Sequence, residues 1–292
     1  MKISFRHGWA MLSAAVLSLT ALPLSAVSSI TTIPAAAATA PVVENLDRGI
    51  VAIKSGNGML VSWRFLASDP TGTEFRLYRD DQLLMTSKGD EATCFYDESG
   101  SAASRYRVDS LVNGTVQTTS TCSLISGTDY FQIPMDVPTA SGCTYSPNDC
   151  SVGDVDGDGV YELFVKWDPS NSKDNSQKGK TGNVYIDCYK LTGEKLWRID
   201  MGKNIRAGAH YTQFLVADFD GDGCAEMTCK TADGTVDGTG KTIGDGSKDY
   251  RNSSGYILSG PEYYTLFDGR TGAALDTVNY VPDRGTVSKW GD

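Results

Sequence analysis

The chain has 292 residues, of which 40% are hydrophobic and 10% aromatic. This composition is typical of a globular protein and excludes an intrinsically disordered chain. Lysine and arginine number 26 against 36 acidic residues, which gives a formal net charge of −10. Nucleic-acid binding needs a basic surface, so we exclude nucleic acid as a general partner. Much of the acid is clustered along the chain, and clustered carboxylates indicate cation binding.

The first forty residues have the pattern of a secretory signal peptide. Lys2, Arg6 and His7 form a positive start, the apolar run WAMLSAAVLSLTALPL follows, and PAAAATA supplies an A-x-A cleavage site. We place the cut after Ala38, so that residues 1–38 are removed. No later apolar stretch approaches the ~20 residues that span a bilayer. We therefore expect a secreted, soluble protein that has no membrane partner. We also expect it to be a monomer.

The next region, residues 39–132, is predicted to consist of short strands between turns. Asn113-Gly114 lies between two alternating segments, which is a strong signal for a two-residue hairpin. Trp63, Tyr78 and Tyr106 are expected to be buried aromatic side chains. The region resembles a fibronectin type III β-sandwich, and we predict a packing domain without catalytic residues. The predicted strands lie within residues 49–53, 58–66, 74–84, 92–99 and 104–120.

Seven cysteines occur in this predicted export context, where disulfides can form. Their number is odd, and their spacing matches no metal-binding knuckle. Cys94–Cys122 and Cys143–Cys150 are the pairs that we would test. The sequence does not decide the pairing.

An internal repeat distinguishes the remaining region, residues 133–292. DVDGDGVYELFVK begins at Asp154 and DFDGDGCAEMTCK at Asp218, in one register over their whole length. A strand–turn–strand pattern follows each copy, at residues 185–200 and 263–278. Units of four short strands with a glycine-rich turn are typical of propeller blades. The second unit carries a long insertion from Asp233 to Pro261, of a kind that often forms a binding surface.

The repeated turn has the ligand pattern of a calcium loop. Three alternating aspartates can converge while two glycines permit a tight backbone, and a carbonyl and a glutamate then follow. Oxygen ligands with several carboxylates favour calcium over zinc or copper. The first loop offers Asp154, Asp156, Asp158, the carbonyl of Val160, and Glu162; the second offers Asp218, Asp220, Asp222, the carbonyl of Cys224, and Glu226.

These loops differ from an EF-hand. An EF-hand needs a bidentate glutamate at position twelve, where Val165 and Cys229 stand, and it needs flanking helices. We interpret them as calcium loops between strands, similar to those of integrin-type propellers. The alternative is a solvated acidic turn. An ion in such a turn is expected to be structural rather than catalytic, because it neutralises carboxylates that would otherwise repel. Asp233 and Asp237 are candidates for a further ion.

Several long and unusual strings occur between Tyr145 and Asp292. They include NDCSVGDVDGDGVYELFVKWDPSNSKDN, KTADGTVDGTGKTIGD, DYRNSSGYILSGPEYYTLFDG and the terminal WGD. With these strings the chain resembles the rhamnogalacturonan lyases of polysaccharide lyase family eleven, and the preceding sandwich is similar to that family's N-terminal domain. The resemblance implies an eight-bladed, calcium-binding β-propeller. It also implies a pectic substrate, the rhamnose–galacturonate backbone of rhamnogalacturonan I.

The reaction that the resemblance implies is β-elimination. A base removes the C5 proton of galacturonate, and the C4–O bond to rhamnose breaks. Loss of that proton adds negative charge beside a carboxylate, so catalysis needs a base together with calcium, lysine or arginine aimed at the carboxylate. Bound cations can reverse the local field of an acidic protein that acts on an acidic polymer.

Asn148 and Asp168 are, by similarity, the residues that we predict to contact the sugar. Asp168 has an equally good alternative role as a turn former before Pro169. His210 is the only histidine after the predicted signal peptide and is the candidate general base. Its alternative role is that of a hydrogen-bonded histidine on a blade strand.

Arg206, Lys166 and Lys230 are candidates for pairing with uronate carboxylates. The alternative is that these cations are solvated or merely neighbour the calcium loops.

One departure from the family is that its propellers continue through roughly six more blades. Two blades cannot close a ring and would leave strand edges exposed, so we expect an incomplete copy. The rival functions are a non-catalytic, calcium-dependent carbohydrate-binding or adhesion module, and a structural repeat protein.

Overall fold

The computed structural model describes residues 45–208 and 210–287. The predicted signal peptide and the terminal WGD lie outside these residues. The described chain contains strands β1 to β18 and no helix, which confirms the all-β class. Within the same residues, no helical segment of the length and apolarity that a membrane crossing requires is found.

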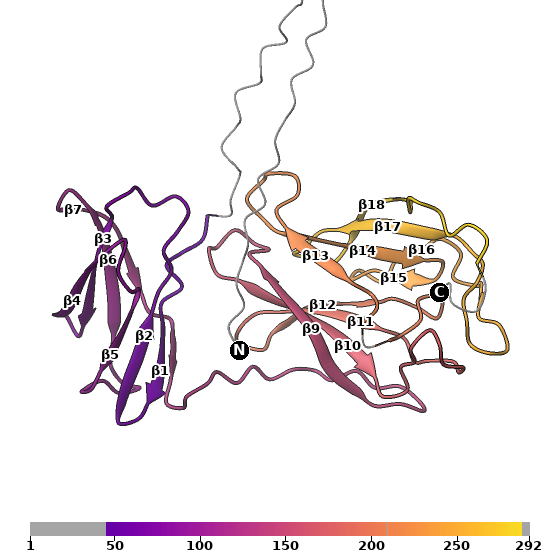
Figure 1. Ribbon diagram of the computed structural model, residues 1–292, viewed down its shortest axis with the longest axis horizontal. Helices are drawn as coiled ribbons and strands as arrows, with labels where there is room; N and C mark the ends of the chain where they lie inside the picture. Colours follow the sequence, from indigo (N-terminus) through magenta and orange to yellow (C-terminus); the bar gives the residue numbers. More distant parts are fainter. Residues whose placement is uncertain (1–44, 209, 288–292) are drawn as a thin grey trace, which may run out of the picture. The chain divides into compact units, whose positions relative to one another are not determined.

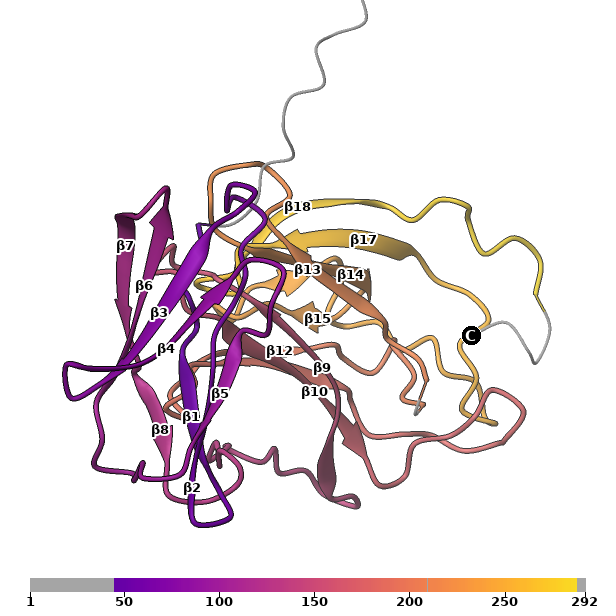
Figure 2. The ribbon, with the colours of Figure 1, turned by 60° about the vertical axis from the view of Figure 1, so that its left-hand side comes forward.

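The N-terminal region consists of two four-stranded sheets (Figures 1 and 2). The first has the order β5 (Cys94–Asp97), β2 (Gly58–Ser62), β1 (Val51–Ser55) and β8 (Leu124–Ser126). The second has the order β4 (Gln82–Lys88), β3 (Glu74–Arg79), β6 (Tyr106–Val112) and β7 (Thr115–Thr121). Neighbouring strands are antiparallel, except that β1 and β8 are parallel.

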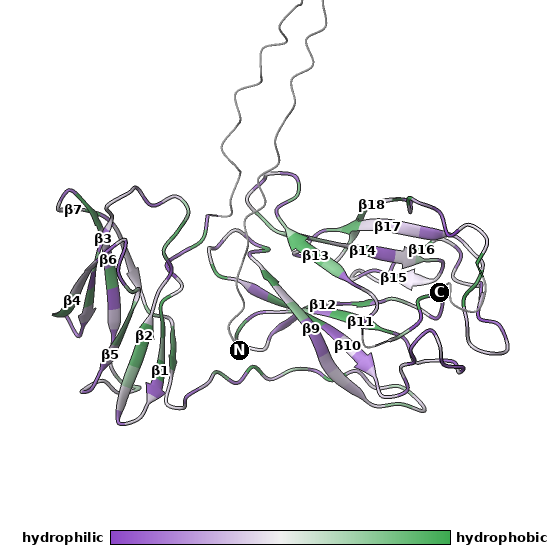
Figure 3. Ribbon diagram, viewed as in Figure 1, coloured by the Kyte–Doolittle hydropathy of each residue, from purple (hydrophilic) through white to green (hydrophobic). Residues whose placement is uncertain are grey.

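Both of these sheets contribute side chains to one buried cluster. Ala52 and Val61 come from the first sheet, and Phe75 and Val108 from the second. Strand β2 is hydrophobic along most of its length (Figure 3). Two sheets that enclose a common core form the packing expected for a β-sandwich.

The aromatic residues of this region are placed in two ways. Trp63 and Tyr106 lie in the buried cluster, as predicted. Tyr78 is only half-buried, contrary to expectation, because its ring faces the Arg107 guanidinium at 4.1 Å rather than the core.

Two tight turns connect strands of the second sheet. The hairpin predicted at Asn113-Gly114 is confirmed, with φ of 52° and 78° at the two residues, and it joins β6 to β7. Asp80 and Asp81 form a second turn, between β3 and β4, with φ of 47° and 67°. Positive φ at both central residues is characteristic of the hairpin turn whose twist matches the strands.

The two predicted repeat units form two antiparallel meanders. The first contains β9 (Tyr145–Gly153), β10 (Glu162–Pro169), β11 (Tyr185–Tyr189) and β12 (Lys195–Asp200). The second contains β13 (Phe214–Ala217), β14 (Glu226–Ala232), β17 (Glu262–Phe267) and β18 (Ala274–Asn279). Gly153 pairs with Glu162 in the first unit, and Ala217 pairs with Glu226 in the second. The acidic turns therefore occupy equivalent positions, which confirms the internal repeat.

The insertion in the second unit adds a short hairpin, β15 (Thr235–Val236) and β16 (Thr242–Ile243). This hairpin pairs with β12 through Asp200 and Val236, so it extends the sheet of the first unit to six strands. Phe164 and Ile186 of the first unit and Phe267 of the second lie in one buried cluster. The two units therefore share a core.

All seven cysteines are free in the structure, so neither of the two pairs proposed for testing is bridged. The Cys122 thiol instead donates to the Ile50 carbonyl at 3.2 Å. Cys94 and Cys150 are exposed.

Candidate functional site

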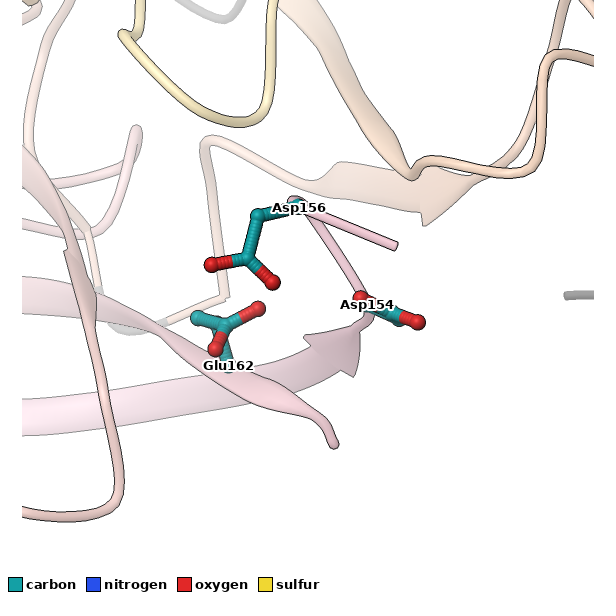
Figure 4. Close-up of side chains that lie close together, drawn as sticks. All are labelled: Asp154, Asp156 and Glu162. Atoms are coloured by element: carbon teal, nitrogen blue, oxygen red, sulfur yellow. The ribbon is translucent and has the colours of Figure 1, made fainter. Parts of the chain in front are cut away.

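Each copy of the repeated turn brings three carboxylates together. Asp154, Asp156 and Glu162 offer oxygen atoms that lie within 4.8 Å of one another. Figure 4 shows the carboxylates of Asp156 and Glu162 close together, with Asp154 on the neighbouring stretch of the loop. In the second copy the cluster consists of Asp218, Asp220 and Glu226.

Backbone amides hold the first carboxylate of each loop. Asp154 accepts hydrogen bonds from the amides of Gly157 at 2.8 Å and Gly159 at 2.8 Å. These glycines have φ of 75° and 88°, in the left-handed region that favours glycine. Asp218 accepts the equivalent bonds in the second loop, from Gly221 and Gly223. The first aspartate and the two glycines of the D-x-D-G-D-G pattern are therefore explained by the turn itself.

The glutamate of each cluster is buried. Glu162 is 2% exposed, and this burial raises its pKa to about 7, with further increases from the charges of Asp156 and Asp158. Burial also raises the pKa of Glu226. A site that raises the pKa of a carboxyl favours neutralisation, either by a proton or by a cation.

Asp156 carries a buried oxygen that has no hydrogen-bond partner in the described part of the chain. This oxygen is Oδ1, whereas Oδ2 accepts a bond from Lys190 Nζ at 2.9 Å. An unpaired buried oxygen beside two other carboxylates fits a hard cation, because buried polar atoms otherwise find partners. The cluster can hold a metal ion.

The third aspartate of each loop belongs to neither cluster. Asp158 accepts a hydrogen bond from the Val160 amide, and Asp222 accepts one from the Cys224 amide, both at 2.8 Å. The structure therefore assigns these two carboxylates to the turn. The proposed ligand roles of these two carboxylates, and of the carbonyls of Val160 and Cys224, stay predictions.

Asp233 and Asp237 also lie outside the two clusters. Asp233 is buried and accepts hydrogen bonds from the hydroxyls of Tyr250 at 2.8 Å and Tyr263 at 3.0 Å. Asp237 organises its own turn and accepts the amide of Ala274 at 3.0 Å. A further ion at this pair stays a prediction, since their oxygens are already hydrogen-bonded.

A pocket of about 530 Å³ brings three of the predicted catalytic residues together. Arg206 and His210 reach it from the connection between β12 and β13, and Lys230 reaches it from β14. Arg284, which follows β18, also lines it. Within the described chain, the residues that line this pocket include no aspartate or glutamate. We refer to it as the β14 pocket.

Lys230 and Arg284 share one carboxylate behind the lining. The Oε1 atom of Glu262 lies 2.6 Å from Lys230 Nζ and 2.9 Å from Arg284 Nη2. Burial favours a higher pKa for Glu262, but the hydrogen bonds from the two cations outweigh burial and lower it. Glu262 and Arg284 could not be predicted from the sequence as site residues, because no local pattern links residues so far apart.

Arg206 and His210 differ in their surroundings. Arg206 is 6% exposed, and its guanidinium lies over the Tyr256 ring at 4.8 Å and donates to the Asp174 carbonyl at 3.3 Å. His210 is exposed in a turn, so it does not occupy a blade strand. Because His210 both lines the pocket and is exposed, it is accessible to a ligand.

Lys166 lies behind the pocket wall rather than on it. It is 1% exposed and donates to Asp149 Oδ2 at 2.5 Å and to the Tyr211 carbonyl at 2.8 Å. Tyr211 lines the β14 pocket, so Lys166 contacts the site through the backbone of its wall. A direct role of Lys166 toward a uronate stays a prediction.

Asn148 and Asp168 do not line the β14 pocket. Asn148 is exposed on β9, and Asp168 is the penultimate residue of β10 and accepts a hydrogen bond from the Ser172 hydroxyl at 2.9 Å. The bond to Ser172 is the contact of a turn former. The sugar contacts of both residues stay predictions.

Two family descriptions match the chain. Residues 130–292, more than half of the chain, match the description "Rhamnogalacturonan lyase family 11, C-terminal domain". The chain belongs to this family. Residues 41–124 match the description "Rhamnogalacturonan I lyases beta-sheet domain". The resemblance inferred from the repeated turn and its flanking strings is therefore confirmed.

Curated relatives within this family include two lyases of Bacillus subtilis (strain 168). The chain is 56% identical over 256 residues to the rhamnogalacturonan endolyase YesW, which covers 86% of this chain and 41% of YesW. It is 52% identical over 256 residues to the rhamnogalacturonan exolyase YesX, which covers 86% of this chain and 42% of YesX. The chain thus spans less than half the length of either relative.

Solved structures of family 11 lyases have the same fold over the matched region. The crystal structure of YesW matches with a TM-score of 0.78 and 56% identity, over 86% of this chain and 44% of that chain. The rhamnogalacturonan lyase of Bacillus licheniformis matches with a TM-score of 0.73 and 53% identity, over 86% of this chain and 44% of that chain.

Proposed function

We propose that the chain acts in a secreted, calcium-dependent lyase that cleaves the rhamnose–galacturonate bond of rhamnogalacturonan I by β-elimination. Family membership supports the reaction class. The observation that carries the proposal is the β14 pocket, which gathers Arg206, Lys230 and Arg284 and has no acidic lining residue among the described residues of a chain of net charge −10. A pocket of this charge suits an anionic sugar.

The proposed reaction uses residues of the pocket in separate roles. The galacturonate carboxylate pairs with cations of the pocket such as Lys230, which stabilise the charge that develops when the C5 proton leaves. His210 accepts that proton. The electron pair forms the C4–C5 double bond as the C4–O bond breaks, and the rhamnosyl oxygen takes up a proton from water as it leaves.

Calcium is assigned to the two carboxylate clusters. Asp154, Asp156 and Glu162 would hold one ion, and the equivalent trio of the second loop would hold another. The ion would supply positive charge that neutralises each acidic turn, so the turn could keep its conformation at neutral pH. This role supports the fold around the pocket.

Export is part of the proposal. The positive start, apolar run and A-x-A site within residues 1–38 support it. N-terminal sequencing of protein recovered from the medium should begin at Thr39. A chain that retains Met1 and stays inside the cell would contradict export.

Product analysis tests the proposed reaction. Calcium-loaded protein is incubated with rhamnogalacturonan I, and the oligosaccharides are examined by mass spectrometry. Elimination leaves an unsaturated galacturonate at the new non-reducing end, which makes that product lighter by one water than the product of hydrolysis. Binding without new ends would instead favour a non-catalytic carbohydrate-binding module, a role that the exposed turn position of His210 also fits.

A further inference from the structure

The β14 pocket has a positively charged side formed by three separate elements. Lys230 lies on β14 and pairs with Tyr264 of β17. Glu262 begins β17, and its carbonyl accepts the amide of Tyr280 at 2.9 Å. This backbone bond places the segment after β18, which carries Arg284, beside the start of β17. Residues far apart in the sequence therefore converge on one wall.

The charges on this wall do not cancel. Glu262 is the single acidic partner of Lys230 and Arg284 in the described chain, and it uses the same Oε1 atom for both. One negative charge therefore faces two positive charges. Lys230 is 36% exposed, whereas the side chains of Glu262 and Arg284 are each 11% exposed. The lysine ammonium can reach a ligand, while the other two side chains are held in place.

Backbone carbonyls fix the orientation of Arg284. Its Nη1 atom donates to the carbonyls of Ile257 and Ser259. Its Nη2 atom bonds to Glu262, and its Nε atom is buried and has no hydrogen-bond partner among residues 45–208 and 210–287. A guanidinium held in this way loses little conformational freedom when it binds an anion.

Two aromatic rings stand beside these cations. Tyr264 and Tyr280 both line the pocket, with ring centroids 6.1 Å apart and planes at 65°. Rings of this kind offer an apolar surface and a polar hydroxyl, which suits the two faces of a sugar ring.

We propose that Lys230 and Arg284 form a carboxylate-binding subsite for a uronic acid residue, and that Glu262 is a positioning residue that holds the two cations together. The inference rests on the proposed lyase function, since it assigns the uronate of the substrate to this wall. Glu262 also competes with the ligand, because it accepts hydrogen bonds from donors that would otherwise bind a uronate carboxylate.

Calorimetry with paired ligands tests the subsite. The ligands are a rhamnose–galacturonate oligosaccharide and its carboxyl-reduced, neutral counterpart. Wild-type protein should prefer the acidic ligand by about tenfold, and Arg284→Gln should remove most of that preference while binding of the neutral ligand stays unchanged. Lys248→Gln, which removes an exposed lysine outside the pocket, is the matched control.

A gain of affinity separates the proposal from simple damage to the fold. Glu262→Gln keeps an oxygen acceptor for both cations and removes its charge, so the acidic ligand should bind several-fold more tightly. The proposal is overturned if Glu262→Gln leaves the affinity for the acidic ligand unchanged or lowers it. It is also overturned if Arg284→Gln lowers the affinity for both ligands equally. Thermal unfolding of each variant confirms that it is folded.

The outcomes distinguish this subsite from the lyase function. If the acidic ligand binds through Lys230 and Arg284 but is never cleaved, the subsite stands and the proposed reaction fails. If the ligand is cleaved while its affinity is unchanged by both Arg284→Gln and Glu262→Gln, the reaction stands and the subsite is wrong.

Discussion

Each acidic turn contains one buried glutamate, and burial raises the pKa of its carboxyl group. Burial raises the pKa of Glu162 from its ordinary 4.5 to about 7, and the neighbouring aspartate charges add to this effect. Burial raises the pKa of Glu226 as well. Without a cation, these turns therefore contain carboxyl groups that hold protons more tightly in the folded chain than in the unfolded chain.

The stability of the metal-free protein is expected to fall as the pH rises from about 4.5 to about 7. In this window folded Glu162 keeps a proton that the unfolded chain has released, so the free energy of unfolding decreases with pH. Thermal unfolding of calcium-free protein across this range measures the effect. Glu162→Gln should flatten the dependence. A wild-type midpoint that rises steadily through the window would contradict the assignment.

The proposed base and cation also give a prediction at single residues. His210→Ala should lower kcat for elimination by about 10²- to 10⁴-fold, the usual contribution of a general base. Lys230→Ala should lower kcat/KM because the developing charge loses a partner. Initial rates on rhamnogalacturonan I measure both, with Lys248→Ala as the control. If neither substitution changes elimination, the roles given to His210 and Lys230 are wrong.

Sequence reasoning found those site residues that are neighbours along the chain. Asp154, Asp156 and Glu162 were predicted together because one turn contains all three. Glu262 and Arg284 were missed, since Glu262 meets Lys230 across 32 residues and only strand pairing brings them into contact. The hydrogen bond from the Val160 amide to Asp158 also had no sequence signal, because it depends on the loop conformation.

Among the structural elements, strands β10, β11 and β12 are joined by one buried carboxylate. Asp187 of β11 is fully buried and accepts hydrogen bonds from Trp167 Nε1 at 2.8 Å, the Tyr189 hydroxyl at 2.7 Å and Arg198 Nε at 2.7 Å. Trp167 lies on β10 and Arg198 on β12. One side chain therefore ties three strands of the first repeat unit.

Removing this carboxylate should destabilise the first unit. Asp187→Ala leaves the Trp167 and Arg198 donors without their partner, so we expect a loss of about 3 kcal/mol in the free energy of unfolding. Asp187→Asn retains an oxygen acceptor and should cost less. Denaturant unfolding measures both, and the exposed Asp129→Ala serves as the control. A loss below about 1 kcal/mol for Asp187→Ala would show that the network contributes little.

The elements that could be predicted are those with a local signal. Asn113-Gly114 requires positive φ at both residues and marks its hairpin, and the doubled turn marks two strand pairs. The pairing of β15 with β12 had no such signal, since it joins the insertion of one unit to the sheet of the other. Long-range pairing depends on which edge is open, which the sequence pattern does not encode.

At the scale of the whole molecule, a chain of net charge −10 keeps its β14 pocket free of acidic lining residues among those described. The acidic residues gather instead in turns such as 154–162 and 218–226. This separation allows an acidic protein to attract an acidic polymer at one place, provided that cations neutralise the turns.

Removal of calcium should lower the melting temperature at neutral pH. An ion that binds only the folded state at a concentration of a hundred times its Kd contributes about 2.7 kcal/mol per site. Unfolding curves in excess calcium and in excess chelator measure the difference. Asp154→Asn combined with Asp218→Asn should reduce it. Equal midpoints in calcium and chelator would contradict the calcium assignment.

The proposed elimination is tested most directly by the ultraviolet absorbance of unsaturated uronate when the calcium-loaded protein acts on rhamnogalacturonan I. We expect a steady rise in absorbance that stops in excess chelator. We expect no rise on a carboxyl-reduced polymer, which has lost the group that acidifies the C5 proton. Absence of any rise from folded, calcium-loaded protein that binds the polymer would contradict the proposed elimination and favour a carbohydrate-binding role.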